Sequence, residues 1–274
     1  MNSANTSYQD RLSQHIDAYL SLVTNHPKVR LSEFESLAEY AQINHALNIL
    51  EAPAEGRILE QLYPAAHIDR ADFLKIKASE YADKVLVTDW SLANINNSYY
   101  DAVLSLAPIH HANHIEKSQY VCGAHKALKP NGVLAFGEVE AGSKLHRFLD
   151  EFIHQHSFSG HVGQYPNADF ANVIKGAGFD YVSSDIKLSY WRFDSADFLY
   201  QYMTQLFALK PMAKAYLLDA VHAYLGISES HSLSESQNLS ENQGLSENQG
   251  LSENNGQLSI NWPLRFYRGV KANI

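Results

Sequence analysis

The chain has 274 residues, 45% of them hydrophobic and 19% charged, a composition that is ordinary for a globular protein and argues against wholesale disorder. Its formal charge is -9, and no run of Lys or Arg supplies the basic stripe that a phosphate backbone requires, so we expect no nucleic-acid partner. The single cysteine, Cys122, excludes an intrachain disulfide and a thiolate zinc cluster, and its context SQYVCGAHKAL predicts a buried thiol on a helix.

The first residues, MNSANTSYQDRLSQHIDAYL, lack the basic region and the continuous apolar stretch of a signal peptide. No later segment approaches the roughly 18 uninterrupted apolar residues of a membrane span. We therefore expect a cytoplasmic protein with no membrane partner.

Helical periodicity runs through residues 8–50 and predicts two or three N-terminal helices. Ser32 and Glu35 have the spacing of a capping box, which predicts a helix start close to Ser32. We assign residues 1–50 to an N-terminal helical segment.

Short apolar runs alternate with helical stretches from residue 57 onward. The runs are Arg57–Glu60, Lys84–Val87, Asp101–Leu106 and Gly132–Phe136. This alternation predicts βαβ units, and unbroken apolar runs are typical of strands covered on both faces. The prediction is an α/β fold with a Rossmann-like, mostly parallel sheet, helices on both faces, and a domain made of residues 51–194 plus 258–274.

The C-terminal third predicts further helices and strands. Residues 169–179 indicate a helix stopped by glycine, and residues 180–193 a strand after it. We expect residues 195–227 to be a helical cap insertion before the last strand, broken at Pro211, and residues 258–274 to contain that strand.

A six-residue unit recurs between residues 233 and 256 as LSESQN, LSENQG, LSENQG and LSENNG. Hexapeptide units can build a β-helix, but one leucine per unit cannot bury a useful core. The repeat therefore predicts a disordered low-complexity loop, which we place at residues 228–257.

The segment YYDAVLSLAPIHHANHIEKSQYVCGAHKALKPNGVLAFGEV predicts a strand, a helix and a strand. Tyr100 and Asp101 open the first strand, His110 and His111 close the loop after it, and residues 128–132 make the turn before the second. This order resembles the second half of a class I S-adenosylmethionine (SAM)-dependent methyltransferase of the small-molecule type. The resemblance implies SAM as cofactor and a small-molecule substrate as partner.

Asp89 and Trp90 stand shortly before this segment, twelve residues ahead of Asp101. The resemblance implies that Asp89 accepts the adenine amino group, that Trp90 covers the adenine face, and that Leu106 lies beside the cofactor. The alternative for Asp89 is a carboxylate that caps the next turn.

The glycine-rich loop of the family is degenerate here, where ALNILEAPAEGRILEQLYP offers two registers. The first, which we favour, takes Arg57–Glu60 as the strand, makes Glu60 the acidic cofactor residue, and puts residues 61–64 at the glycine turn. The second takes Ile49–Glu51 as the strand and Ala52–Gly56 as the loop. In the family, the absent side chains let the backbone approach SAM closely.

Only 28 residues separate Glu60 from Asp89, which predicts that a strand or helix is lost or shortened. This shortening removes the family's ribose carboxylate in our interpretation. Asp69 and Asp72 are the candidates to replace it.

Histidines cluster after two of the predicted strands. We predict that His111 is a catalytic base, since an imidazole titrates near neutral pH, and that His110, His161 and Tyr165 contact the substrate. His110 and His114 also have the spacing of a helical zinc pair, but no third ligand is evident, so we expect no metal.

The leading hypothesis is a SAM-dependent methyltransferase acting on a small-molecule acceptor. The alternative is a catalytically inactive methyltransferase-like protein that serves as a binding or partner subunit, which the crowded glycine turn favours. A dinucleotide-dependent dehydrogenase is disfavoured, because no G-x-G-x-x-G follows any predicted strand.

Overall fold

The structure is a computed structural model that describes residues 16–43, 45, 47–73, 85–107, 109–230 and 257–273. In this part of the chain, eight strands form one sheet in the order β3-β2-β1-β4-β5-β8-β6, with β7 paired to β8. The strands are β1 (Asn48–Glu51), β2 (His67–Asp72), β3 (Val85–Val87), β4 (Tyr100–Leu106), β5 (Leu128–Glu138), β6 (Phe179–Phe193), β7 (Ile227–Ser230) and β8 (Gln257–Lys271). Neighbours from β3 to β5 are parallel, and β8 is antiparallel to its partners, which confirms the predicted mostly parallel sheet.

The order of the strands reverses at β1. β2 and β3 extend the sheet on one side of β1, and the chain then crosses to place β4 on the other side. In open α/β sheets, ligands bind outside the carboxyl ends of the strands at such a switch point. The residues that end β1 and β4, Glu51 and Leu106, therefore mark the edge where a ligand site is expected.

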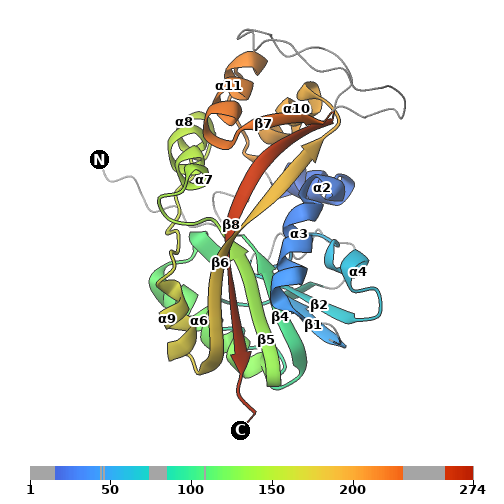
Figure 1. The fold of residues 1–274 in the computed structure, drawn as a ribbon, viewed down its shortest axis with the longest axis vertical. Coiled ribbons are helices and arrows are strands. Elements are labelled where there is room, and N and C mark those ends of the chain that lie inside the picture. Colours follow the sequence, from blue (N-terminus) through green and yellow to red (C-terminus); the bar gives the residue numbers. More distant parts are fainter. Residues whose placement is uncertain are drawn as a thin grey trace, which may run out of the picture.

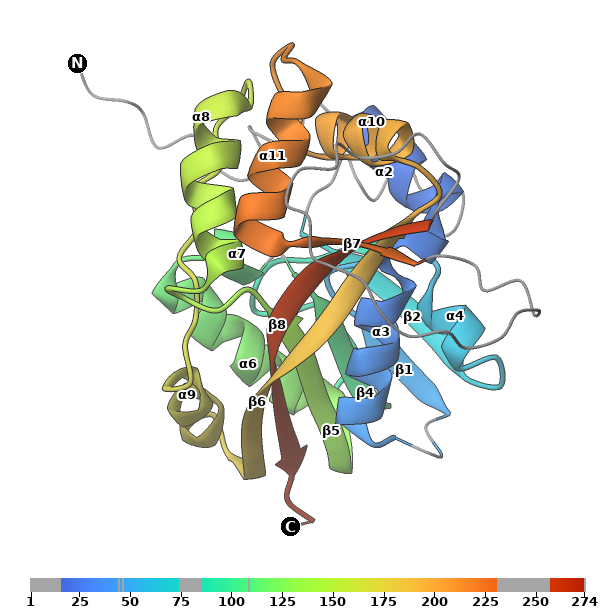
Figure 2. The same cartoon turned by 45° about the horizontal axis from the view of Figure 1, so that its top comes forward.

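Helices cover both faces of the sheet (Figures 1 and 2). α3 (Pro27–Ala41) packs on one face, and α6 (His114–Ala127) and α9 (Phe170–Gly176) pack on the other. Strand β4 shows why both faces are covered. The side chain of Leu104 packs in the core under α3, and that of its neighbour Val103 packs in the core under α6. A strand buried on both faces needs the continuous apolar run that the sequence carries.

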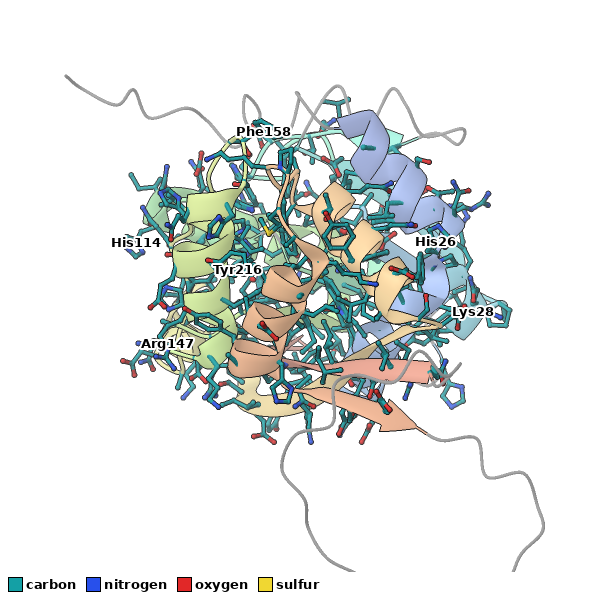
Figure 3. The ribbon with its side chains drawn as sticks, turned by 90° about the horizontal axis from the view of Figure 1, so that it is seen from above. His26, Lys28, His114, Arg147, Phe158 and Tyr216 are labelled. Carbon is teal, nitrogen blue, oxygen red and sulfur yellow. The ribbon has the colours of Figure 1, made fainter. Side chains whose placement is uncertain are left out.

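A helical layer lies above the carboxyl edge of the parallel strands (Figure 1). β6 and β8 support it, because they continue past the end of β5: Glu138 pairs with Arg265, whereas β6 and β8 stay paired up to Phe193 and Leu258. α2 (Ile16–Asn25), α10 (Ala196–Leu206) and α11 (Lys214–Leu225) form the layer together with the helix after β5. Figure 3, seen from above, shows α11 between that helix and α10.

The helix after β5 is missing from the sequence prediction. It consists of α7 (Lys144–Arg147), the π-helical segment η2 (Phe148–Ile153) and α8 (His154–His156), which follow one another without a break. Leu145, Phe148 and Phe152 are buried at three- and four-residue spacing, so the helical signal is present in the sequence. The predicted insertion at residues 195–227 corresponds to α10, α11 and a break at residues 207–213 that contains Pro211.

Two N-terminal boundaries differ from the prediction. α3 begins at Pro27 rather than near Ser32, because proline at the first helical position suits the fixed φ of its ring. The hydroxyl of Ser32 lies inside the helix and accepts a hydrogen bond from the backbone N–H of Tyr190 at 3.2 Å. β1 begins at Asn48, so the sheet starts before residue 51.

The favoured register of the glycine loop is wrong. Ile49–Glu51 belongs to the strand β1, whereas Leu59–Leu62 forms the one-turn helix α4. Ile49 and Leu50 are fully buried and pair with β2 and β4, whereas Arg57 is exposed. Between Glu60 and Asp89 the structure describes the strands β2 and β3, and β3 is only three residues long.

Residues 231–256, including the hexapeptide repeat, lie outside the described residues. The two ends of the predicted loop are strand, because Ser228 to Ser230 belong to β7 and Gln257 begins β8. Their backbones pair in antiparallel register, which draws both ends into the sheet. None of the helices that the structure describes is long and apolar enough to cross a membrane.

Candidate functional site

Three adjacent strands bring carboxylates to one edge of the sheet. Glu51 is the last residue of β1 and Asp72 is the last residue of β2, and both are buried. Asp89 follows β3 by two residues and is exposed. Because these strands are parallel, the three carboxylates lie along the edge that contains the switch point.

Glu51, and not Glu60, occupies the acidic position at the end of the first strand. Its Oε1 accepts a hydrogen bond from the backbone N–H of Glu55 at 3.2 Å, and Arg70 Nε lies 3.7 Å from its Oε2. Glu60 instead lies on α4 and forms ion pairs with Arg70 and with Arg57. The predicted cofactor role of Glu60 assumes a residue at the end of a central strand, and in the structure Glu51 holds that position.

The loop after β1, residues 52–56, is buried and held by the N-terminal helices. Arg30 on α3 donates to Oε2 of Glu33 at 2.7 Å and to Oε2 of Glu55 at 2.9 Å, and the Tyr19 hydroxyl also donates to Glu55. Burial raises the pKa of Glu33 despite the attraction of Arg30. Gly56 has a φ of 94°, so the one glycine of this loop adopts a conformation that other residues avoid.

Asp89 caps the turn that follows it. Its Oδ1 accepts hydrogen bonds from the backbone N–H of Ser91 at 2.9 Å and from the Ser91 hydroxyl at 2.5 Å, and the hydroxyl bond is the main cause of its lowered pKa. Trp90 packs on Phe73 with ring centroids 3.9 Å apart. Leu106 is buried at the end of β4 within the core under α3. Asp89 and Trp90 thus lie at the predicted edge, and Leu106 ends β4 at the same edge with its side chain in the core.

The predicted substrate residues converge on one cluster from two segments. His110 and His111 lie on the 3-10 helix η1 (Ile109–His111) after β4, and His161 and Tyr165 lie in the loop after α8. The ring centroid of His110 is 4.1 Å from that of His111, 5.4 Å from that of His161 and 5.0 Å from that of Tyr165. We call these four residues the imidazole cluster.

Glu138, the last residue of β5, orients His110. Its Oε1 lies 2.7 Å from Nδ1 of His110, and its Oε2 accepts the backbone N–H of His110 at 3.0 Å. Because an ionised carboxylate only accepts, Nδ1 carries the proton and Nε2 is the opposite nitrogen of the ring. This Nε2 is buried, and no residue in the described part of the chain forms a hydrogen bond with it. Glu138 is absent from the predicted site residues, although an acid that ends a buried strand is a usable signal.

Asp150 supports the other half of the imidazole cluster. It accepts a hydrogen bond from the Tyr165 hydroxyl at 2.7 Å, and that hydroxyl also lies 3.1 Å from Nδ1 of His161. Burial opposes ionisation of Asp150, but the nearby His161 ring and the hydrogen bond from Tyr165 outweigh it and lower its pKa. Burial and the bond to Asp150 raise the pKa of Tyr165, which keeps its hydroxyl protonated.

The loop that carries His161 and Tyr165 is fastened to η1. The backbone N–H of Gln164 donates to the carbonyl of His110 at 2.7 Å, and the buried Lys117 on α6 donates to the carbonyl of Gln164. Gly163 permits this approach, because a Cβ there would lie 2.8 Å from the Tyr165 ring and 2.9 Å from the His110 ring. Burial lowers the pKa of Lys117.

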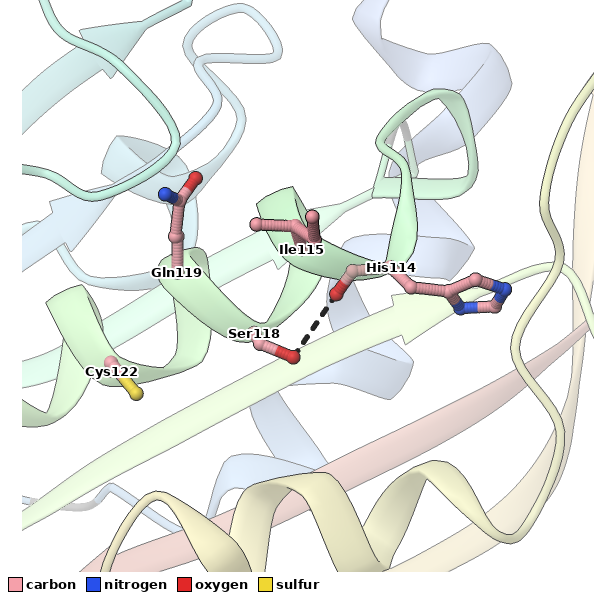
Figure 4. A pocket seen from close by; sticks show the side chains of 5 residues that line it. All are labelled: His114, Ile115, Ser118, Gln119 and Cys122. Atoms are coloured by element: carbon pink, nitrogen blue, oxygen red, sulfur yellow. Dashed lines mark hydrogen bonds between the residues drawn. The ribbon is translucent and has the colours of Figure 1, made fainter.

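His114 does not join the imidazole cluster. It begins α6 and is exposed beside an open depression of about 460 Å³ that Ile115, Ser118, Gln119 and Cys122 also line (Figure 4). Cys122 is exposed, so the predicted burial of its thiol is wrong. The apolar face of α6 is set by its buried neighbours, Tyr120, Val121 and Ala124, which leaves Cys122 outside. The depression contains no convergent polar groups that indicate chemistry.

Comparison with known proteins supports the fold. No protein-family model matches the chain, and no curated protein matches it. Solved structures do match: a protein of Bacillus halodurans described as a methyltransferase (TM-score 0.54, 12% identity, covering 88% of this chain and 100% of the other) is one of them. A SAM-dependent methyltransferase of Thermotoga maritima aligns with a TM-score of 0.53 and 14% identity, covering 96% of this chain and 99% of the other.

A third similar structure is the phosphoethanolamine N-methyltransferase 2 of Haemonchus contortus in complex with S-adenosylhomocysteine. It aligns with a TM-score of 0.52 and 12% identity, covering 98% of this chain and 61% of the other. At these identities the similarity establishes the architecture. The chain has the class I methyltransferase fold, as the segment from Tyr99 to Glu138 predicts.

Proposed function

We propose that this protein is a SAM-dependent methyltransferase that acts on a small-molecule acceptor. One observation carries the proposal. At the switch point of a class I methyltransferase fold, the carboxylates that follow β1, β2 and β3 lie on one side, and the imidazole cluster that follows β4 and β5 lies on the other. The first set suits adenosine, which is rich in donors, and the second suits an acceptor that must lose a proton.

SAM would lie along the carboxylate side. In this arrangement Asp72 accepts from the ribose hydroxyls, Asp89 accepts the adenine amino group, and Trp90 covers the adenine ring. Glu51 orders the loop at the methionine end, and Leu106 flanks the cofactor from the end of β4. The H. contortus enzyme with this fold was crystallised with SAM as well as with S-adenosylhomocysteine, which supports the choice of cofactor.

The acceptor would lie against the imidazole cluster. Its lone pair attacks the methyl carbon of SAM, the carbon–sulfur bond breaks, and the bond pair stays on sulfur to give S-adenosylhomocysteine. His111 takes the acceptor proton, while His110, His161 and Tyr165 hold the acceptor in line with the methyl group. Positioning supplies most of the rate, since such alignment accounts for about 7–11 kcal/mol of barrier in favourable cases.

Calorimetry of the full chain with SAM and with S-adenosylhomocysteine tests the proposal. We expect one saturable site, weakened about tenfold or more in Asp89→Ala, because losing a hydrogen bond to a charged group costs roughly 1.5–3 kcal/mol. Asp72→Asn should weaken both ligands similarly. Asp185→Asn, an exposed carboxylate on β6, is the matched control and should bind as the wild type does.

The same experiment tests the alternative function, which is that of an inactive binding or partner subunit. A folded wild-type sample that gives no binding heat at millimolar SAM would contradict the methyltransferase proposal. The buried loop at residues 52–56 would then be interpreted as filling the methionine end of the site.

A further inference from the structure

Three imidazoles meet within the cluster. His110, His111 and His161 each offer one ring nitrogen, and these three atoms all lie within 4.8 Å of one another. His110 adds an independent indication, because its side chain is only 6% exposed and its Nε2 is buried without a hydrogen-bond partner among the residues that the structure describes. A buried polar atom in this state costs free energy unless something binds it.

We propose that His110, His111 and His161 bind one divalent transition-metal ion such as Zn²⁺. The donor set decides the class of ion. Imidazole nitrogen suits zinc, cobalt, nickel and copper, whereas magnesium and calcium prefer oxygen ligands. Three protein ligands with a fourth position open to a small molecule are typical of a catalytic zinc site.

The spacing is compatible with a shared ion after small rotations of the rings. Zinc binds imidazole nitrogen at about 2.0–2.1 Å, so two nitrogens on a tetrahedral ion lie about 3.4 Å apart. The three nitrogens lie within 4.8 Å of one another, so they must approach by at most about 1.4 Å. η1 and the loop of His161 are already joined by the hydrogen bond from Gln164 to His110, which limits the movement to side chains.

Carboxylates lie next to two of the three proposed ligand histidines, His110 and His161. Glu138 holds Nδ1 of His110 and thereby directs Nε2 as the ligand atom, and Asp150 with Tyr165 lies against Nδ1 of His161. A carboxylate that orients a ligating histidine raises its basicity, and such groups are common around zinc. The ammonium of Lys117 also lies near Glu138 and opposes a cation, but two carboxylates outnumber it.

The site also suggests how an acceptor would be activated, and this part rests on the proposed function. An acceptor hydroxyl or thiol bound at the open position would lose its proton to water more readily, because the ion stabilises the resulting anion. His111 would then be a ligand rather than the base. Metal binding itself does not depend on SAM, so the two proposals can fail separately.

Titration of the metal-free full chain with Co²⁺, followed by visible absorption and by elemental analysis, tests the site without SAM. We expect one equivalent to bind with a Kd below about 100 µM and Zn²⁺ to displace it. His110→Gln and His161→Gln should weaken binding at least a hundredfold, and Glu138→Gln about 10- to 100-fold. His114→Gln, an exposed histidine four residues from His110, is the matched control and should leave the affinity unchanged.

Circular dichroism of each variant separates loss of a ligand from loss of the fold. If His110→Gln does not fold, His161→Gln in the loop after α8 and Glu138→Gln carry the comparison. The proposal is overturned if the folded wild type binds Co²⁺ more weakly than about 100 µM. It is also overturned if folded His110→Gln and His161→Gln bind as tightly as the wild type, or if His114→Gln abolishes binding.

Discussion

Glu138 contacts His110 at two points, with Oε1 2.7 Å from the imidazole Nδ1 and Oε2 3.0 Å from the backbone nitrogen. The first contact fixes the orientation of the ring, and the second fixes the turn that carries it. Because Glu138 ends β5 and His110 follows β4, this pair joins the two neighbouring strands at the edge where the site lies. The position of His110 in the imidazole cluster depends on this pair.

Replacing Glu138 with Gln should therefore destabilise the protein. Oε1 and Oε2 together accept from the ring and backbone of His110 and from the backbone of Val139, and an amide turns one acceptor into a donor. We expect the free energy of unfolding to fall by about 1–3 kcal/mol in urea titrations at neutral pH. Glu35→Gln, exposed on α3, should change it by less than about 0.5 kcal/mol. Equal stability of the two variants would contradict the assignment.

Arg30 should be the costliest of the buried charges to remove. Its side chain is 7% exposed, and Arg30→Met leaves Glu33 and Glu55 buried without their cation. Removing one partner of a buried ion pair lowers the free energy of unfolding by about 3–5 kcal/mol. Chemical denaturation of the single variant should show this loss.

The triple variant Arg30→Met, Glu33→Gln, Glu55→Gln provides the internal control for that loss. It removes all three charges and keeps an acceptor for the Tyr19 hydroxyl, so it should recover at least half of the lost stability. A triple variant that is less stable than Arg30→Met would contradict this account. It would show that the ion pairs themselves stabilise the fold, and that the loss in Arg30→Met does not come from burying two carboxylates without a cation.

Asp101 should make the fold sensitive to acid. Burial opposes its ionisation, but hydrogen bonds from Lys129 and from the backbones of Asn48 and Leu47 lower its pKa in the folded protein. A folded pKa below the unfolded value of about 3.9 contributes stability above that value, which is lost as the pH falls through the folded pKa.

Asp101→Asn should consequently lower the free energy of unfolding by about 1–3 kcal/mol at pH 7, and by less at a pH of about 2. Urea unfolding at both pH values measures the difference. Asp185→Asn, exposed on β6, serves as control at each pH. A deficit that is the same at both pH values would mean that ionisation of Asp101 contributes nothing.

The segment between β7 and β8 should be replaceable by a tight turn. Ser230 and Gln257 are directly paired in antiparallel register, and two-residue Asn-Gly turns join such neighbours. A chain with Asn-Gly in place of residues 231–256 should melt within about 4 °C of the wild type by calorimetry. A fall of more than about 10 °C would mean that the hexapeptide repeat contributes to the stability of the fold.

The segment from β4 to β5 could be predicted in detail because its signals are local. Asp101 lies near the start of β4, and Asn131 adopts a φ of 62°, the left-handed conformation expected for a residue that replaces glycine. The predicted turn at residues 128–132 is wrong in one respect, because these residues already belong to β5, where the register against β4 is irregular. The meeting of His110 with His161 also followed from a general rule, since the segments after neighbouring parallel strands reach the same edge.

The first strand could not be chosen locally. Ile49–Glu51 and Arg57–Glu60 are both apolar runs that end in glutamate, and only the pairing of β1 with the distant β2 and β4 separates them. Asp150 could not be predicted for the same reason. It lies on the helix after β5, which is absent from the sequence prediction, and this helix places it against His161 and Tyr165. Contacts between residues remote in sequence leave no periodic signal.

A crystal structure of the full chain with S-adenosylhomocysteine tests the central claim most directly. We predict that the adenine lies beside Trp90 and Asp89, that the ribose hydroxyls lie within hydrogen-bond distance of Asp72, and that the sulfur points toward His111. S-Adenosylhomocysteine bound away from the carboxyl ends of β1 and β4, or absent from crystals soaked at millimolar concentration with this edge open to solvent, would contradict the account.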